Sequence, residues 1–184
     1  MVQFYSAARR AKPRKELTVT IDELDPFGQG VARYQGKALF VSGALPGEKV
    51  QVIVQEDKRH YSRGKATRLL TQSPDRVVAR CPHYGECGGC QQQHVSEALQ
   101  QQSKKNALER MLNHNSSQPL NVEQVIRGDS WHYRRRARLS LRWDNKQQRL
   151  EMGFRKSGSS EIVNIRQCPV MVQPLERLLP ELRQ

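Results

Sequence analysis

The sequence predicts a mainly β protein with two folded parts, a small closed β-barrel followed by an α+β domain. Three observations predict this. Short segments of alternating apolar and polar residues, separated by turn residues, fill residues 16–72. A segment rich in cysteine and glycine then interrupts the pattern, and one helical segment with several further strand patterns follows it. A length of 184 residues suits one or two domains.

The barrel is predicted from five strand patterns. Leu17, Val19 and Ile21 alternate with polar residues, which is the period of a half-buried strand. Gln35-Gly36 is a hairpin signal. The expected strands are 17–21, 30–34, 37–41, 50–54 and 64–70. Five short strands in one such stretch are typical of a small barrel of the oligonucleotide-binding (OB) type.

The second predicted domain covers residues 73–184. Ser96 is the expected N-cap of a helix that runs to about Asn113, with its apolar residues roughly on one face. Strands are expected at 133–141, 149–155 and 161–165, and a short helix from Pro174. Residues 1–15, basic and without an apolar period, are expected to form a flexible arm.

The charge balance indicates a polyanionic partner. Lys and Arg number 31 against 18 Asp and Glu, a formal net charge of +13. Nucleic acid is the first candidate for such a protein, and a merely basic protein without that partner is the alternative. No apolar stretch approaches the ~20 residues of a membrane-spanning helix, and the N-terminus lacks the apolar centre of a signal peptide. We therefore expect a cytoplasmic protein, a monomer, with reduced thiols.

The four cysteines have the spacing of metal ligands. Cys81, Cys87 and Cys90 form a C-x5-C-x2-C motif, and Cys168 lies far downstream. Four thiolates suit a tetrahedral zinc ion or a [4Fe–4S] cluster. Because three ligands are grouped and the fourth is remote, the pattern favours the cluster, although zinc and unrelated buried thiols stay possible on spacing alone. The Gly88-Gly89 pair would let backbone amides approach the inorganic sulfides.

A run of arginines predicts a nucleic-acid-binding face. Eleven Lys and Arg stand against four Asp and Glu in residues 127–166. In a strand, alternate residues face opposite sides. The core-facing set is then Ala137, Leu139, Leu141 and Trp143. The predicted RNA-contacting set is Arg134, Arg136, Arg138 and Arg142, with Arg155 and Lys156 on the neighbouring strand. Arg135 would point towards the core. A solvated charged face is the alternative.

Three motifs resemble known families. The run Gly28-Gln29-Gly30-Val31-Ala32-Arg33, with Leu45-Pro46-Gly47-Glu48, is similar to a TRAM domain, a small RNA-binding barrel. The stretch from Cys81 to His94 resembles the cluster-binding motif of the bacterial RNA uracil-5-methyltransferases. The segments 133–138, 153–156 and Cys168-Pro169 resemble the same family's central domain.

This resemblance implies a cofactor, a substrate and a methyl donor. The cofactor is a [4Fe–4S] cluster on Cys81, Cys87, Cys90 and Cys168. The substrate is 23S ribosomal RNA, and S-adenosylmethionine (SAM) is the methyl donor of the intact enzyme. Family members continue into a Rossmann-like methyltransferase domain, whereas this sequence has no Gly-rich SAM loop and no Asp-Pro-Pro motif. The chain is therefore expected to be the N-terminal part of such an enzyme.

The chemistry of the reaction predicts that this part is inactive alone. Uracil C5 becomes nucleophilic only after a thiolate adds at C6, and a base later removes the C5 proton. The cluster accounts for all four cysteines, so no catalytic residue is expected in this chain. A stand-alone RNA-binding iron–sulfur or zinc protein is the alternative. A radical-SAM enzyme is disfavoured by the x5 spacing and the fourth cysteine.

Overall fold

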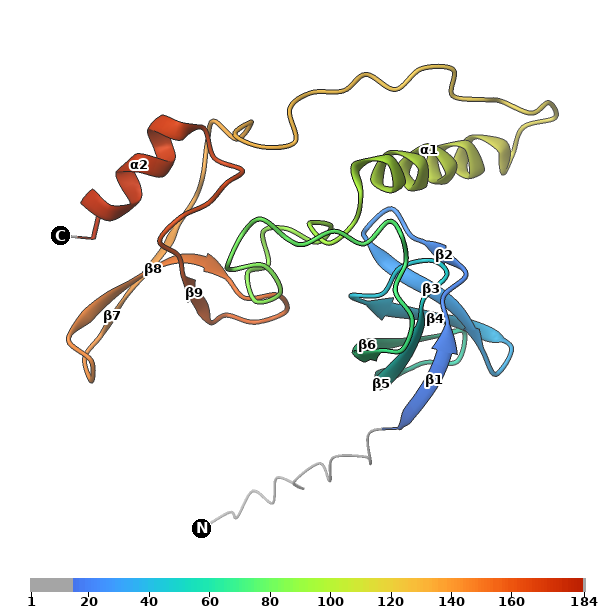
Figure 1. Cartoon of the computed structure of the whole chain (residues 1–184), viewed down its shortest axis with the longest axis horizontal. Coiled ribbons are helices and arrows are strands. Elements are labelled where there is room, and N and C mark those ends of the chain that lie inside the picture. Colours follow the sequence, from blue (N-terminus) through green and yellow to red (C-terminus); the bar gives the residue numbers. More distant parts are fainter. Residues whose placement is uncertain (1–14, 184) are drawn as a thin grey trace, which may run out of the picture. The chain divides into compact units, whose positions relative to one another are not determined.

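The chain divides into two compact units. A computed structural model describes residues 15–183, so the predicted basic arm lies outside the described residues except for Lys15. The first unit holds residues 15–25 and 29–74 of this part, and the second holds 26–28 and 75–183. Figure 1 shows the elements of each unit, and the units are described separately. No helix in residues 15–183 combines the length and apolar character needed to span a membrane.

The first unit is one curled six-stranded sheet (Figure 1). Its strands are β1 (Glu16–Thr20), β2 (Glu23–Leu24), β3 (Gln29–Tyr34), β4 (Lys37–Ser42), β5 (Lys49–Asp57) and β6 (Tyr61–Leu69). Their order is β1-β5-β6-β4-β3-β2, with β4 and β6 parallel and the other pairs antiparallel. The five expected strands are present, and β2 is an additional short one. β1 and β2 are the sheet's edges in the described structure, so the predicted hydrogen-bonded closure is absent there.

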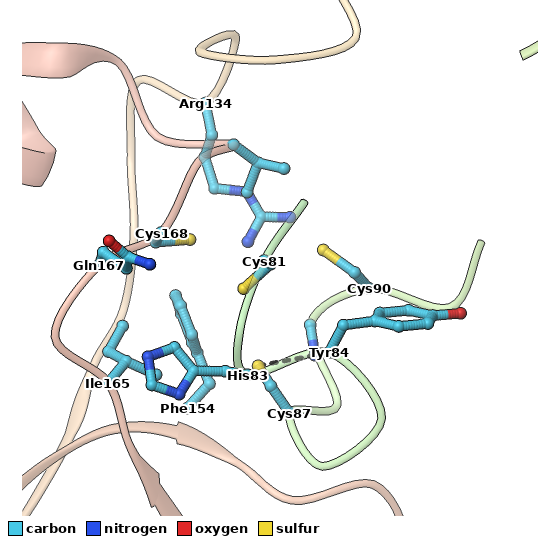
Figure 2. Close-up of a pocket in the computed structure, with 12 residues that line it drawn as sticks. Cys81, His83, Tyr84, Cys87, Cys90, Arg134, Phe154, Ile165, Gln167 and Cys168 are labelled. Atoms are coloured by element: carbon cyan, nitrogen blue, oxygen red, sulfur yellow. Dashed lines mark hydrogen bonds between the residues drawn. The ribbon is translucent and has the colours of Figure 1, made fainter. Parts of the chain in front are cut away.

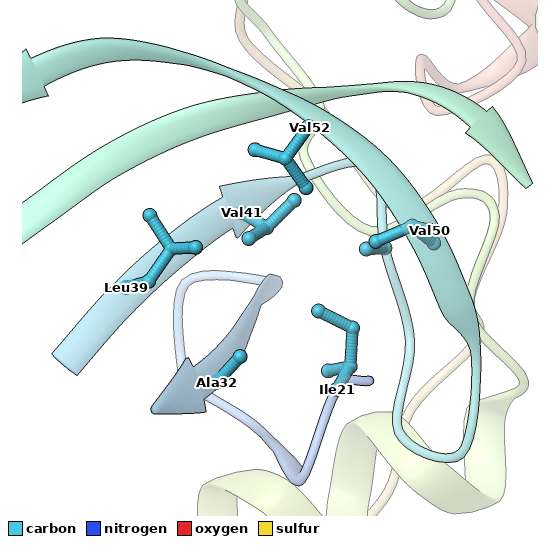
Figure 3. Close-up of a cluster of buried hydrophobic side chains, with 7 residues drawn as sticks. Ile21, Ala32, Leu39, Val41, Val50 and Val52 are labelled. Atoms are coloured by element: carbon cyan, nitrogen blue, oxygen red, sulfur yellow. The ribbon is translucent and has the colours of Figure 1, made fainter. Parts of the chain in front are cut away.

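The core of this unit follows from the alternation in its strands. Side chains from successive strands meet inside the curl, as Figure 3 shows. The buried set is Ile21, Ala32, Leu39, Val41, Ala44, Val50 and Val52. Gly64 on β6 lies against this core, and a Cβ there would stand 2.4 Å from Cγ1 of Val52. Only glycine therefore permits this close approach of β6 to β5.

A buried carboxylate fixes one end of the sheet. Glu48 follows the turn Leu45-Pro46-Gly47 and is fully buried. The Leu45 amide donates a hydrogen bond to Glu48 Oε2 at 2.8 Å, and the Ser73 amide donates to Oε1 at 3.1 Å. Glu48 thus binds its own turn to the segment that leaves the sheet after β6, which explains an acidic residue in the core.

The second unit contains a three-stranded antiparallel sheet and two helices. The strands are β7 (Ser140–Asp144), β8 (Arg149–Arg155) and β9 (Ile162–Asn164), in the order β7-β8-β9. Helix α1 spans Glu97–Asn113 and α2 spans Gln173–Glu181. The hydroxyl of Ser96 accepts a hydrogen bond from the Leu99 amide at 3.1 Å, which confirms the predicted N-cap. The core of the unit is Met152, Val163, Ile165, Cys168, Val170, Met171 and Leu179.

One expectation for this unit is wrong. The strand predicted from Tyr133 begins only at Ser140, and before it only Arg134 forms an isolated bridge, with Met171. The apolar residues of α1 were expected roughly on one face, and Leu108, Met111 and Leu112 of this set are exposed in this structure. In the β7–β8 register, residues before Arg138 would lie beyond the end of β8 at Arg155, so β8 gives them no partner strand.

Candidate functional site: a cysteine pocket beside a basic segment

All four cysteines line one pocket of the second unit. Cys81, Cys87 and Cys90 lie in the loop between β6 and α1, and Cys168 lies between β9 and α2. Figure 2 shows the four sulfur atoms around this space. The thiols are free, Cys168 is buried and the other three are half-buried. The fold therefore brings together residues that are almost eighty positions apart in the sequence.

The remaining wall of the pocket is mostly apolar. It includes Phe154, Ile165 and Val170, together with the polar side chains of His83 and Gln167. Within residues 15–183, no group of three His, Cys, Asp or Glu side chains is placed to hold a single metal ion. The cysteines thus surround a shared space in the described structure without converging on one point.

Burial controls the protonation of two of these thiols. Burial raises the pKa of Cys81, and the neighbouring Cys90 and Cys87 sulfurs raise it further. Burial is also the main cause of the raised pKa of Cys168. Because both pKa values lie above the usual range of a thiol, these two groups stay protonated at neutral pH. A bound metal centre would displace those protons, since thiolate is the form that ligates.

The loop that carries three cysteines is fixed to the end of β8. The Gly88 amide donates to the Arg155 carbonyl at 2.9 Å, and a Cβ at Gly88 would stand 2.9 Å from that oxygen. Cys87 forms a β-bridge with Lys156, and the Ser157 amide donates to the Glu86 carbonyl at 3.3 Å. The absence of a side chain at Gly88 therefore allows the loop backbone to approach β8 closely. The Gly89 amide instead donates to Cys87 Sγ at 3.4 Å, the dashed line in Figure 2.

The glutamines after Cys90 brace the loop. Gln91 Nε2 donates to the Gly88 carbonyl at 2.8 Å, and Gln92 Nε2 donates to the Pro26 carbonyl at 2.9 Å. Gln93 Oε1 accepts from the Cys81 amide at 3.0 Å. The polar run at 91–93 is thus a structural part of the cysteine motif.

Cys168 is held from the other side of the pocket. Its amide donates to Glu176 Oε1 in the first turn of α2 at 2.8 Å. The residues that follow Cys168 contact the basic segment, which is residues 133–142. The Arg134 amide donates to the Val170 carbonyl at 2.8 Å, and the Val172 amide donates to the Arg134 carbonyl at 3.0 Å. The cysteine pocket and the start of the basic segment therefore share backbone hydrogen bonds.

The six predicted RNA-contacting residues do not form one strand face. Arg136, Arg138 and Arg155 are exposed, and none of them has a carboxylate partner within the described residues. Arg142 forms an ion pair with Glu151 at 2.6 Å, and Lys156 forms one with Glu161 at 3.7 Å. The sixth residue, Arg134, is half-buried and lines the cysteine pocket.

The predicted register of this segment is wrong. Ala137, Leu141 and Trp143, expected in the core, are exposed, and only Leu139 packs partly against it. Arg135, expected to point inwards, is exposed as well. The alternation rule failed for Arg135 and Ala137 because residues 133–139 are not a strand, so they have no two opposite faces. Leu141 and Trp143 lie in β7, and their face of that strand is not covered in the described structure.

A groove in the same unit was not predicted. Its lining includes the exposed rings of Phe27 and Tyr133, the ring of Trp131, and several polar side chains of the 91–93 and 100–104 segments. Phe27 is 72% exposed, which is unusual for an aromatic residue with only a packing role. The sequence shows these aromatics, but their wide separation gives no signal that they share one groove.

Comparison with known proteins identifies the class of the chain. Residues 10–67 match the family model of the TRAM domain. A solved structure, the Pyrococcus abyssi tRNA (uracil-54, C5)-methyltransferase in complex with S-adenosyl-L-homocysteine, is similar with a TM-score of 0.60 and 25% identity. The similarity covers 90% of this chain and 35% of that one. The chain thus contains a TRAM domain, and its fold is similar to that of the matching part of an RNA uracil-C5 methyltransferase.

Sequence relatives define the family more narrowly. The 23S rRNA (uracil(1939)-C(5))-methyltransferase RlmD of Enterobacter sp. (strain 638) is 57% identical over 183 residues. The protein of the same name from Klebsiella pneumoniae (strain 342) is 56% identical over 184 residues. In each case the match covers all of this chain and 41% of the relative. Over its whole length the chain is similar to part of these rRNA uracil-C5 methyltransferases, and it spans about two fifths of their length.

Proposed function

We propose that this chain is the RNA-binding, [4Fe–4S]-containing N-terminal part of a 23S rRNA (uracil-5-)-methyltransferase. In intact form, such an enzyme transfers a methyl group from SAM to uracil C5. The observation that carries the proposal is the gathering of all four cysteines around one pocket, in a chain that is 56–57% identical to part of the RlmD enzymes. The domain organisation that goes with it is a TRAM barrel at 16–72 and an iron–sulfur α+β domain at 73–184.

The proposed cluster ligands are Cys81, Cys87, Cys90 and Cys168. A cubane cluster binds one thiolate at each of four iron corners, so its ligands are spread around an object larger than a single ion. Thiols that surround a shared space suit this better than the tetrahedral zinc geometry, in which four sulfurs stand about 2.3 Å from one point. The Gly89 amide at Cys87 Sγ supplies a hydrogen bond of the kind that stabilises ligand sulfurs.

The proposed RNA-contacting residues are Arg136, Arg138, Arg155 and Lys156, with smaller contributions from Arg142 and Arg134. The first three are exposed cations without a carboxylate partner in the described part of the chain, and phosphate oxygens are the natural partners of guanidinium groups. The TRAM barrel and the net charge of +13 support the same partner. We expect a cytoplasmic monomer that binds 23S rRNA and, by itself, transfers no methyl group.

The cofactor is tested on protein purified under anaerobic conditions. Assays of iron, acid-labile sulfide and zinc should give about four irons and four sulfides per chain, with a broad visible absorption. Cys168→Ser should lose most of the iron. Zinc at one ion per chain without sulfide would show instead a structural zinc protein. RNA binding by the same samples then tests the second half of the proposal.

A further inference from the structure

The side chain of Arg134 lines the cysteine pocket. Figure 2 shows its guanidinium group directed towards the cysteine sulfurs. The backbone of Arg134 is fixed there by hydrogen bonds with Val170 and Val172, of 2.8 and 3.0 Å, and by its bridge to Met171. Arg134 therefore lies beside the segment that carries Cys168, and its direction follows from the fold.

The guanidinium of Arg134 has no counter-charge in the described structure. No carboxylate in residues 15–183 forms an ion pair with it. The side chain is half-buried against a wall that includes Phe154, Ile165 and Val170. An arginine is always charged, and removing it from water without an anion is costly. The position is explained if an anion occupies the pocket.

A four-thiolate cluster is such an anion. Four thiolates bring more negative charge than the iron–sulfide core offsets, so the whole group is negatively charged. Reduction by one electron adds a further negative charge. A fixed cation nearby stabilises the reduced form more than the oxidised form, because the attraction grows with the charge.

We propose that Arg134 is the counter-ion of the iron–sulfur cluster, and that its charge helps to retain the cluster and raises its reduction potential. This inference rests on the proposed cluster. It removes Arg134 from the RNA-contacting set and gives one residue of the basic segment a separate role.

The test compares three variants of the anaerobic protein. Arg134→Gln removes the charge and keeps a polar side chain, and Arg134→Lys keeps the charge. Arg149→Gln is the matched control, since Arg149 is an exposed cation at the start of β8 and does not line the pocket. For each variant, iron per chain is measured, and the midpoint potential is taken from a dithionite titration followed by visible absorption and electron paramagnetic resonance.

We expect the midpoint of Arg134→Gln to move to more negative potential, or its iron content to fall, while Arg134→Lys and Arg149→Gln stay near the parent. An Arg134→Gln protein with the parent's iron content and potential overturns the inference alone. If Arg134→Gln and Arg134→Lys lose iron or shift the midpoint potential equally, the inference is also overturned. The arginine side chain would then matter for its shape and not for its charge. A parent without iron and sulfide overturns the proposed cofactor itself, and the inference with it.

Discussion

The salt dependence of RNA binding tests whether ion pairing decides which cations contact RNA. Arg136 and Arg142 are both exposed arginines of the same segment, but only Arg142 donates from Nε and Nη2 to Glu151 Oε2, at 2.9 and 2.6 Å. Replacing either with glutamine removes one positive charge. We expect Arg136→Gln to weaken RNA binding and lower its salt dependence, and Arg142→Gln to change both much less.

The magnitudes follow from the cations that remain available. Arg136, Arg138 and Arg155 have no ion-pair partner in residues 15–183, and Lys156 has only the longer 3.7 Å ion pair with Glu161. Counted as four phosphate contacts, each contributes roughly 0.7 to the slope of log K against log salt on a single strand. The parent slope is then about 3, so that binding weakens about 50-fold between 50 and 200 mM salt. Loss of one contact should lower the slope by about 0.7. Glu151→Gln releases Arg142 and should raise the slope by up to about the same amount.

The assay is fluorescence anisotropy with a labelled single-stranded RNA at several KCl concentrations, with a thermal melt of each variant. Equal slopes for Arg136→Gln and Arg142→Gln would refute the claim that Glu151 withholds Arg142 from the RNA. If Arg136→Gln, Arg138→Gln and Arg155→Gln all keep the parent slope, the basic segment is a solvated surface, and the RNA is bound elsewhere.

Two further predictions concern stability. Glu48→Ala leaves the Leu45 and Ser73 amides without their acceptor, so the first unit should lose at least about 2 kcal/mol in chemical denaturation; an unchanged midpoint would contradict this. The raised pKa of Cys81 and Cys168 means that the folded, cluster-free protein holds more protons than the unfolded chain above pH 9. The contribution of these two thiols to the free energy of unfolding should therefore be fully present at neutral pH and be lost as the pH rises through the pKa of the folded thiols. The melting temperature of a Cys81→Ala/Cys168→Ala protein, compared at pH 7 and 10, should show a smaller decrease than the parent's.

Local signals predicted the first unit well, because its strands pair mostly with close neighbours. The alternation of Val50 and Val52 places both in the core, and Gln35-Gly36 forms the turn between β3 and β4. Closure of the barrel was less predictable, because it depends on hydrogen bonds between the edge strands β1 and β2. No local residue pattern indicates whether these two strands pair. The role of Glu48 was also hidden, because its partner Ser73 lies outside the turn motif.

The grouping of the cysteines was predictable from the sequence, but their surroundings were not. The spacing of Cys81, Cys87 and Cys90 predicts a metal site, which stays a prediction, and the fold places Cys168 in the same pocket. The position of Arg134 depends on its pairing with Met171, a contact between distant segments that leaves no periodic trace. One wrong assumption, that residues 133–139 form a strand, misplaced Arg134, Arg135 and Ala137.

The contacts around the cysteines support a structural role for the proposed cluster in RNA binding. The cysteine loop holds β8 through Gly88 and the Arg155 carbonyl, directly before the exposed Lys156. The segment after Cys168 holds the backbone of Arg134, two residues before the exposed Arg136. Both groups of proposed phosphate contacts are therefore attached to the backbone that surrounds the pocket. A cluster that joins the four cysteines would fix these two attachments relative to each other, which reduces the conformational entropy lost when RNA binds.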